Sequence, residues 1–402
     1  MKILDKFIVG TSIFALFSED FNFHYIIDIK LFYFIILLNL SLLALKKQIY
    51  LNKFFFGLIS FFIIHGVLNY IVVGSPIDSL IAQLAGISLS CIFYYSLIKT
   101  YGKQYLIKVY LQFAFWLAVL AIFMFYLRIN VFLNGDRLNG ILQEPAHYAA
   151  IMLPAVYIYW KQNKYFRVFV LVITIMLSKS SMGYIGLFLM IIIPLFKVKY
   201  FMKYVLVVLI PLGAAFYYLY SNWDVNVNSE DSNFFIRRAK QTVESFSAVD
   251  DGKFKQSTNL SSYALLSNMF ITKTSFLNNP LGSGLGSYGS VYEKYYYSME
   301  PPEYLITIGF SKINKDDANS LFLRMLVDFG VFGLFLIGYF ILRASRIFKR
   351  NDKVIEQGTF FYLIIKLIRE GHYFPPEFYF ILLVFIKDFN EDSTHHRRFL
   401  DT

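Results

Sequence analysis

The segment that decides the fold is FFFGLISFFIIHGVLNYIVV, which runs from residue 54 to residue 73. It contains no charged side chain, and as a helix it reaches across about 30 Å, the thickness of the hydrocarbon core of a bilayer. Segments of this kind recur along most of the 402 residues. The pattern therefore predicts an integral membrane protein that is built from helices.

The composition agrees with a membrane protein and excludes several other classes. Apolar residues make up 57% of the chain and charged residues 16%, whereas a soluble domain carries about 25% charged residues. The single cysteine, Cys91, excludes a fold held by disulfide bonds. The net charge of +11 would suggest nucleic acid as the partner of a soluble protein. In a chain this apolar it indicates membrane orientation instead, and we expect no nucleic-acid partner.

We predict an all-α integral membrane fold, a polytopic bundle of about 12 transmembrane helices. The segments at 359–369 and 375–387 are short, so they predict either two crossings or one re-entrant hairpin. The predicted segments are 6–18, 29–45, 54–73, 79–97, 105–127, 146–160, 165–178, 181–196, 201–220, 319–342, 359–369 and 375–387.

Lysine and arginine residues concentrate in alternate loops of this bundle. They gather near residues 46–53, 99–108, 161–167, 197–203 and 343–353. Because basic loops remain in the cytoplasm, these loops and both termini are predicted to be cytoplasmic.

One connecting segment on the opposite side is much longer than the others. The chain divides into an N-terminal transmembrane bundle (1–221), a large external loop (222–318), and C-terminal transmembrane helices with a cytoplasmic tail (319–402). Within the loop, residues 233–246 have the pattern of an amphipathic helix at the membrane surface. Acidic residues outnumber basic ones in the loop, so the positive charge of the chain belongs to the cytoplasmic side.

The first group of candidate site residues precedes the segment at 146–160. Arg137, Glu144 and His147 place a cation, an anion and an imidazole at the outer rim, where ionisable residues are functional candidates by default. Pro145 is suited to start a helix, whose free N–H groups favour an anion. The alternative is an Arg137–Glu144 ion pair that stiffens the loop, with His147 a satisfied buried histidine.

The second group opens the segment at 319–342. Arg324 and Asp328 are four residues apart, so they share one helical face and can pair inside the membrane. We favour a structural role for this pair. Gly330 and Gly333 allow close approach of a neighbouring helix. Asn319, at the outer rim, is the better candidate for contact with a substrate.

Two further groups contain arginine. The charged turn that contains Arg369 and His372 lies between two short apolar segments, where an ordinary polar turn is the alternative. Arg237 and Arg238 lie on the predicted amphipathic helix, and a solvated or headgroup-binding face explains at least one of them.

Several patterns do not support a cofactor. The glycine-rich stretch at 282–286 lacks the βαβ unit of a nucleotide site. The acidic pairs at 250–251 and 316–317 lack a third carboxylate at a helpful spacing for a metal ion. We expect neither a metal nor another cofactor.

The order of the motifs resembles the superfamily of bacterial O-antigen and capsule polymerases and ligases, the Wzy-type polymerases and their relatives. An R-x-x-G-x-x-x-E-P stretch precedes the large loop, and the loop contains N-P-L-G-x-G-x-G-x-Y. After it come N-x-x-x-L-x-x-x-x-(D/E)-x-G-x-x-G and an R-x-G-x-Y turn. In this chain the motifs start at Arg137, Asn279, Asn319 and Arg369 respectively.

The resemblance implies a reaction at the outer face of the bacterial cytoplasmic membrane. Polymerases of this type transfer a glycan from undecaprenyl diphosphate to the terminal hydroxyl of a newly flipped repeat unit. Arginines suit the diphosphate leaving group, and a base near the acceptor hydroxyl assists the transfer. We expect Arg137 and one of Arg237 or Arg238 to bind the diphosphate, with Arg369 as a third candidate cation, and Glu144 or His147 to assist the acceptor. The candidate catalytic residues are Arg137, Glu144, His147 and Arg369, and the candidate substrate-binding residues are Arg237, Arg238, Asn319, Gly284 and His372. A chain-length regulator and a flippase of the same pathway are the implied protein partners.

One departure bears on the choice between polymerase and ligase. Ligases of this superfamily have H-N at the start of the segment after the loop, where this chain has Ala318-Asn319. The departure favours a polymerase over an O-antigen ligase, and it leaves open a related glycan ligase of the teichoic-acid type or a protein O-glycosyltransferase. Two further functions stay open, a flippase or transporter of the lipid-linked oligosaccharide and a membrane scaffold without enzymatic activity.

Overall fold

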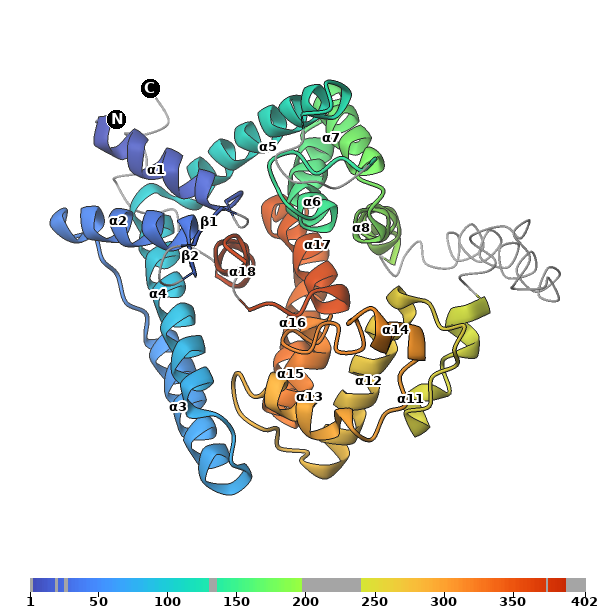
Figure 1. Ribbon diagram of the computed structural model, residues 1–402. Helices are drawn as coiled ribbons and strands as arrows, with labels where there is room; N and C mark the ends of the chain where they lie inside the picture. Colours follow the sequence, from blue (N-terminus) through green and yellow to red (C-terminus); the bar gives the residue numbers. More distant parts are fainter. Residues whose placement is uncertain are drawn as a thin grey trace.

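A computed structural model describes residues 3–18, 21–24, 28–129, 136–196, 240–373 and 375–387. The described chain is almost entirely helical, and the helices lie at steep angles to one another (Figure 1). A short antiparallel hairpin, β1 (Asn22–His24) and β2 (Asp28–Lys30), joins the first two helices. The helices are α1 (Ile3–Ala15), α2 (Leu31–Leu45), α3 (Lys53–Val73), α4 (Ile77–Tyr101), α5 (Lys103–Tyr126), α6 (Pro145–Lys161), α7 (Tyr165–Leu177), α8 (Ser181–Ile192), the 3-10 helix η1 (Ile193–Phe196), α11 (Ala248–Asp251), α12 (Leu260–Asn278), α13 (Tyr288–Tyr296), α14 (Glu303–Thr307), α15 (Leu321–Phe329), α16 (Val331–Phe348), α17 (Val354–Arg369) and α18 (Phe378–Ile386).

Four of these helices are long and apolar enough to cross a membrane: α3, α4, α5 and α16. Three shorter apolar helices, α2, α7 and α8, accompany them. Along α3 and α16 most side chains of the apolar stretch are not buried inside the protein, so these helices present apolar surface outward. A helical membrane protein is therefore supported, while the number of crossings and their orientation stay predictions. The predicted segment at 201–220 and the first half of the predicted amphipathic helix, 233–239, lie outside the described residues.

The prediction of one continuous helix at 319–342 is wrong. The chain forms two helices, α15 and α16, which meet at Gly330. Gly330 has a φ of 55°, and the next residue, Val331, donates its backbone N–H to the carbonyl of Pro280 at 2.9 Å. Because this bond leaves the helix for the glycine-rich turn, the α-helical ladder is interrupted there. The sequence pattern misses the break because apolar residues continue on both sides of it.

The described residues form two apolar cores. The larger core is built by α1 to α8 together with α17 and α18. The smaller core belongs to the region predicted to be the external loop, and it contains buried tyrosines of α12 and α13 that pack with Val327 of α15. These helices lie beside α15 at the lower right of Figure 1. The predicted external loop is therefore a packed helical unit that is anchored on α15.

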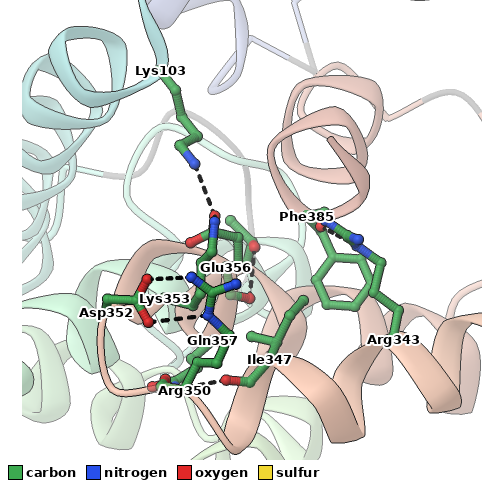
Figure 2. A network of polar contacts seen from close by, with 10 residues as sticks. Lys103, Arg343, Ile347, Arg350, Asp352, Lys353, Glu356, Gln357 and Phe385 are labelled. Atoms are coloured by element: carbon green, nitrogen blue, oxygen red, sulfur yellow. Dashed lines mark hydrogen bonds and ion pairs between the residues drawn. The ribbon is translucent and has the colours of Figure 1, made fainter. Parts of the chain in front are cut away.

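A polar network ties the start of α5 to the turn between α16 and α17 (Figure 2). Lys103 lies 2.8 Å from Glu356, and Lys353 lies 3.4 Å from the same carboxylate. The side chain of Gln357 donates to the carbonyls of Ile347 and Arg350. Both turns are basic loops that the sequence predicts on one side of the membrane, and the structure brings them into contact.

Candidate functional site

The candidate site is built around the turn between α17 and α18, residues 370–373, which we call the rim turn. Its backbone packs directly on residues 316–320, which lead into α15. A Cβ atom on Gly371 would overlap the carbonyl oxygen of Asp317, so the two segments touch through their backbones. The Ser320 hydroxyl donates to the carbonyl of Leu367 at 2.7 Å, and Arg324 donates to the carbonyl of Gly371 at 3.0 Å. Only glycine permits this approach.

His372 is held by a carboxylate on the opposing segment. Its Nε2 atom lies 3.1 Å from Asp317 Oδ2, and half of the His372 side chain is exposed. Burial by itself would raise the pKa of the Asp317 carboxyl, but His372 and the backbone N–H of Asn319 together outweigh burial and lower that pKa. The predicted site residue His372 is therefore anchored at the rim and not directed into the protein.

Asn319 occupies an unusual position next to this pair. Ala318 and Asn319 both have positive φ, 64° and 54°, in the left-handed region where non-glycine residues are uncommon. The Asn319 side chain is buried, and its Nδ2 atom has no hydrogen-bond partner among the described residues. Leaving such a donor without a partner costs about 1–3 kcal/mol. Contact of Asn319 with a substrate stays a prediction.

A second set of ionisable residues meets the rim turn from α6. His147 Nε2 lies 3.8 Å from Glu144 Oε2 and 3.6 Å from Glu370 Oε1. Glu144 is exposed and Glu370 is buried, so His147 stands between the surface and the interior. The structure therefore places Glu144 and Glu370 on either side of His147, an arrangement that the sequence did not predict.

Glu370 continues into a buried group that the sequence analysis did not single out. The ammonium group of Lys366 contacts Glu370 and lies 3.7 Å from Glu377. The hydroxyl of Tyr362 donates to Glu377 at 2.7 Å. All of these side chains are buried. The spacing of Lys366 and Glu370, four apart in an apolar segment, was the available signal.

The predicted pair of Arg324 and Asp328 is confirmed as a buried contact, with 3.8 Å between Arg324 Nε and Asp328 Oδ2. The guanidinium also lies 4.4 Å from the centre of the Tyr373 ring, whose hydroxyl donates to Asp328 at 3.1 Å. Asp328 further accepts from the backbone of Gly286 and from the hydroxyl of Ser287. The pair therefore fixes the rim turn and the glycine-rich turn to α15, as its predicted structural role requires.

Gly284 belongs to this glycine-rich turn. It has a φ of 97°, and its N–H donates to the backbone carbonyl of Asp328 at 2.8 Å. A Cβ atom there would lie 3.3 Å from Asn69 of α3. The predicted residue thus sits where the turn is squeezed between α15 and α3.

The predicted arginines are placed differently from one another. Arg137 donates to the backbone carbonyls of Ser178 and Lys179, at 3.1 and 3.2 Å, and no described carboxylate pairs with it. The alternative of an ion pair with Glu144 is therefore not formed. Arg369 is half-buried, and no hydrogen bond or ion pair joins it to another described residue. Arg237 and Arg238 lie outside the described residues.

An apolar cavity of about 210 Å³ opens beneath the rim turn. At its rim end it is lined by Tyr373, Leu321 and Leu367, and at the opposite end by Lys387. It follows α18 from Phe378 to Lys387, about 13 Å along the helix axis. The walls are almost entirely apolar, with aromatic and aliphatic side chains of α3, α4, α15, α16, α17 and α18.

A smaller hollow lies across the glycine-rich turn from this cavity. It has a volume of about 160 Å³, and its lining is mixed: polar residues that include Asn279, Lys294 and Tyr295 lie beside Val73 and Val291. Ser283 of the turn lines this hollow, whereas Leu285, two residues later, lines the apolar cavity. The turn therefore forms the wall between the apolar cavity and a hollow that offers polar groups.

The described residues contain no group of three metal-ligating side chains close enough to hold an ion. Models of known protein families do not match this chain, and neither do curated proteins.

Proposed function

We propose that the protein is a membrane glycosyltransferase that polymerises undecaprenyl-diphosphate-linked repeat units on the outer face of the bacterial cytoplasmic membrane. The observation that carries the proposal is that a group of ionisable side chains and an apolar cavity meet at the rim turn. Ionisable side chains and the unpartnered amide of Asn319 lie above it, and the apolar cavity opens below it. A lipid-linked sugar has the same division into a charged head and an apolar tail.

The roles of the residues follow from the chemistry of the transfer. The acceptor hydroxyl oxygen forms a bond to the anomeric carbon of the donor glycan while the bond from that carbon to the diphosphate breaks. The diphosphate leaves with the bonding electrons, and Arg137 and Arg369 take up the developing charge. The proton of the acceptor goes to His147.

The remaining predicted residues bind the two substrates. Asn319 and His372 contact the sugars at the rim. Arg237 and Arg238 assist at the diphosphate. Gly284 shapes the wall beside the sugar, because its turn also lines the smaller hollow.

A flippase of the same lipid-linked sugar is the second candidate. The break at Gly330 favours it, because interrupted helices that line a binding site are typical of transporters. A deletion strain separates the two functions. Loss of a polymerase leaves single repeat units on the cell surface, whereas loss of a flippase removes all of them.

Substitution of Arg137 tests the proposed reaction in cells. Arg137→Ala should abolish long glycan chains and leave the single-repeat product, because the leaving diphosphate loses a cation. Arg343→Ala is a matched control, since Arg343 also donates to a backbone carbonyl, that of Phe385, but near the opposite end of the cavity. Wild-type chain lengths in the Arg137 variant, measured on gels of surface glycan, would remove Arg137 from the mechanism.

A further inference from the structure

The strongest unassigned feature is the buried charge triad, which consists of Lys366, Glu370 and Glu377. Lys366 has no exposed surface, and both carboxylates are at least nine-tenths buried. Buried ionisable groups in a membrane protein are costly and are typical of functional sites. At the other end of α17 the balance is reversed, because the buried carboxylate of Glu356 has two cations, Lys103 and Lys353.

The triad contains one anion more than a neutral pair. With all three groups ionised its net charge is −1, and the second oxygen of Glu370, Oε2, has no hydrogen-bond partner among the described residues. An uncompensated negative charge in a buried site favours a nearby cation. The nearest group that can acquire a positive charge is His147, 3.6 Å from Glu370.

Other titratable groups also surround His147 and the triad. Glu144 adds a carboxylate on the exposed side, and Arg324 is already paired with Asp328. Helix α8 contributes no acidic, basic or histidine side chain. Three tyrosines interact with Glu377: Tyr94 of α4, Tyr110 of α5 and Tyr362 of α17. The segments next to the triad in the sequence also carry Arg369, His372 and Tyr373.

We propose that the buried charge triad sets the basicity of His147, so that the imidazole accepts the proton of the acceptor hydroxyl and holds it as an imidazolium beside Glu370. Glu370 acts as the positioning carboxylate, because it lies 3.6 Å from His147 Nε2 on the buried side of the ring, opposite exposed Glu144. Lys366 contacts Glu370 and offsets part of its negative charge, and Glu377 holds the ammonium group of Lys366 from the other side. The proton then leaves past exposed Glu144 to the outer solution. This inference rests on the proposed function for the identity of the proton donor.

The test is a titration of His147 in the full-length protein in lipid nanodiscs, without substrate. Histidine side chains are isotope-labelled, and the His147 signal is identified by its loss in His147→Gln. An opposite charge within about 4–6 Å moves a titration by 1–3 pH units, so Glu370→Gln should lower the midpoint by about that much. Lys366→Met should raise the midpoint, because the triad becomes more negative. The isosteric Glu377→Gln should lower it by less than Glu370→Gln.

Glu356→Gln provides the matched control. It removes a buried carboxylate from the same helix, about 21 Å from Glu370 along the axis, and should leave the midpoint unchanged. An unchanged midpoint in Glu370→Gln, or equal shifts in Glu370→Gln and Glu356→Gln, overturns the inference. The two glutamine variants decide the question if Lys366→Met does not fold.

A rate measurement separates this inference from the proposed function. The pH dependence of polymerisation should move with the midpoint of His147, to lower pH in Glu370→Gln. Because the titration needs no substrate, shifted midpoints in a protein without polymerase activity would refute the proposed function and leave the role of the triad intact. Polymerase activity with an unshifted midpoint would refute the role of the triad alone.

Discussion

Replacement of Gly371 by alanine is the sharpest test of the rim turn. The carbonyl oxygen of Asp317 occupies the position that the new Cβ atom needs. The same backbone contact positions the His372–Asp317 pair, and Gly371 itself accepts a hydrogen bond from Arg324. The methyl group of the new alanine should therefore disturb both the His372–Asp317 pair and the hydrogen bond from Arg324.

The size of the effect follows from the geometry. A carbon and a carbonyl oxygen approach no closer than about 3.3 Å even in weak hydrogen bonds. Since the oxygen lies where the methyl carbon must go, the two segments have to separate by more than about 1 Å. A misplacement of about 1 Å can lower a rate by about 100-fold. We therefore expect Gly371→Ala to slow polymerisation by about 100-fold or more.

The assay is polymerisation of a polyprenyl-diphosphate-linked oligosaccharide by the purified variant in vesicles, with product length read on gels. Gly338→Ala is the control, because nothing lies within 4 Å of a Cβ atom at that position in α16. Helix propensity predicts a gain of about 1 kcal/mol there. Wild-type activity in Gly371→Ala would refute the close contact, and a melting temperature near that of the wild type would show that any loss is local.

Three other predictions concern the cavity and the ion pairs. Cys91→Phe should fill the apolar cavity and raise the KM for the lipid-linked donor about tenfold, or ~1.4 kcal/mol, while Cys91→Ala should leave the KM unchanged. Equal KM values in the two variants would show that the lipid tail does not bind in this cavity. The lowered pKa of Asp317 stabilises the fold above about pH 4, the ordinary aspartate value, and this contribution is lost as the pH falls through the folded value. The difference in melting temperature between wild type and Asp317→Asn should therefore shrink as the pH falls from about 5 to 3. A difference that becomes larger over this range would contradict the prediction. Arg324→Met should destabilise the protein by about 3–5 kcal/mol, because it leaves the buried charge of Asp328 uncompensated. The double variant Arg324→Met with Asp328→Leu should recover much of the lost melting temperature, and a double variant no more stable than Arg324→Met would contradict the prediction.

Much of the fold was predictable because several long apolar segments form helices in place. The segments at 54–73, 79–97 and 105–127 match α3, α4 and α5 to within a few residues. Such segments satisfy their own backbone hydrogen bonds, so local sequence determines them. The break at Gly330 depends instead on the carbonyl of Pro280, fifty residues earlier. A contact between distant segments leaves no trace in a hydropathy pattern.

The candidate site was predictable in its parts but not in its assembly. Polar and ionisable residues at the rim are recognisable in the sequence because burying them in a membrane costs free energy. His147, Asn319 and His372 stand out for this reason. Their meeting point at the rim turn follows from the packing of α17 on α6 and α15, which no local pattern encodes. The pair of Arg137 and Glu144 shows the converse, because proximity in sequence suggested a contact that the chain does not make.

Lys366 shows why one class of functional residue escapes sequence reading. A single lysine in the segment at 359–369 has a stem long enough to reach the membrane surface, so the sequence by itself does not call for an ion pair there. The structure instead encloses it between Glu370, the first residue of the rim turn, and Glu377, which follows the turn. The charge excess arises only when these three groups and His147 are brought together. The cluster of a buried lysine with two acidic neighbours is therefore a stronger sign of proton chemistry than any one of these residues alone. Lys366→Met and Glu370→Gln should shift the titration midpoint of His147 in opposite directions, and this result tests the conclusion directly.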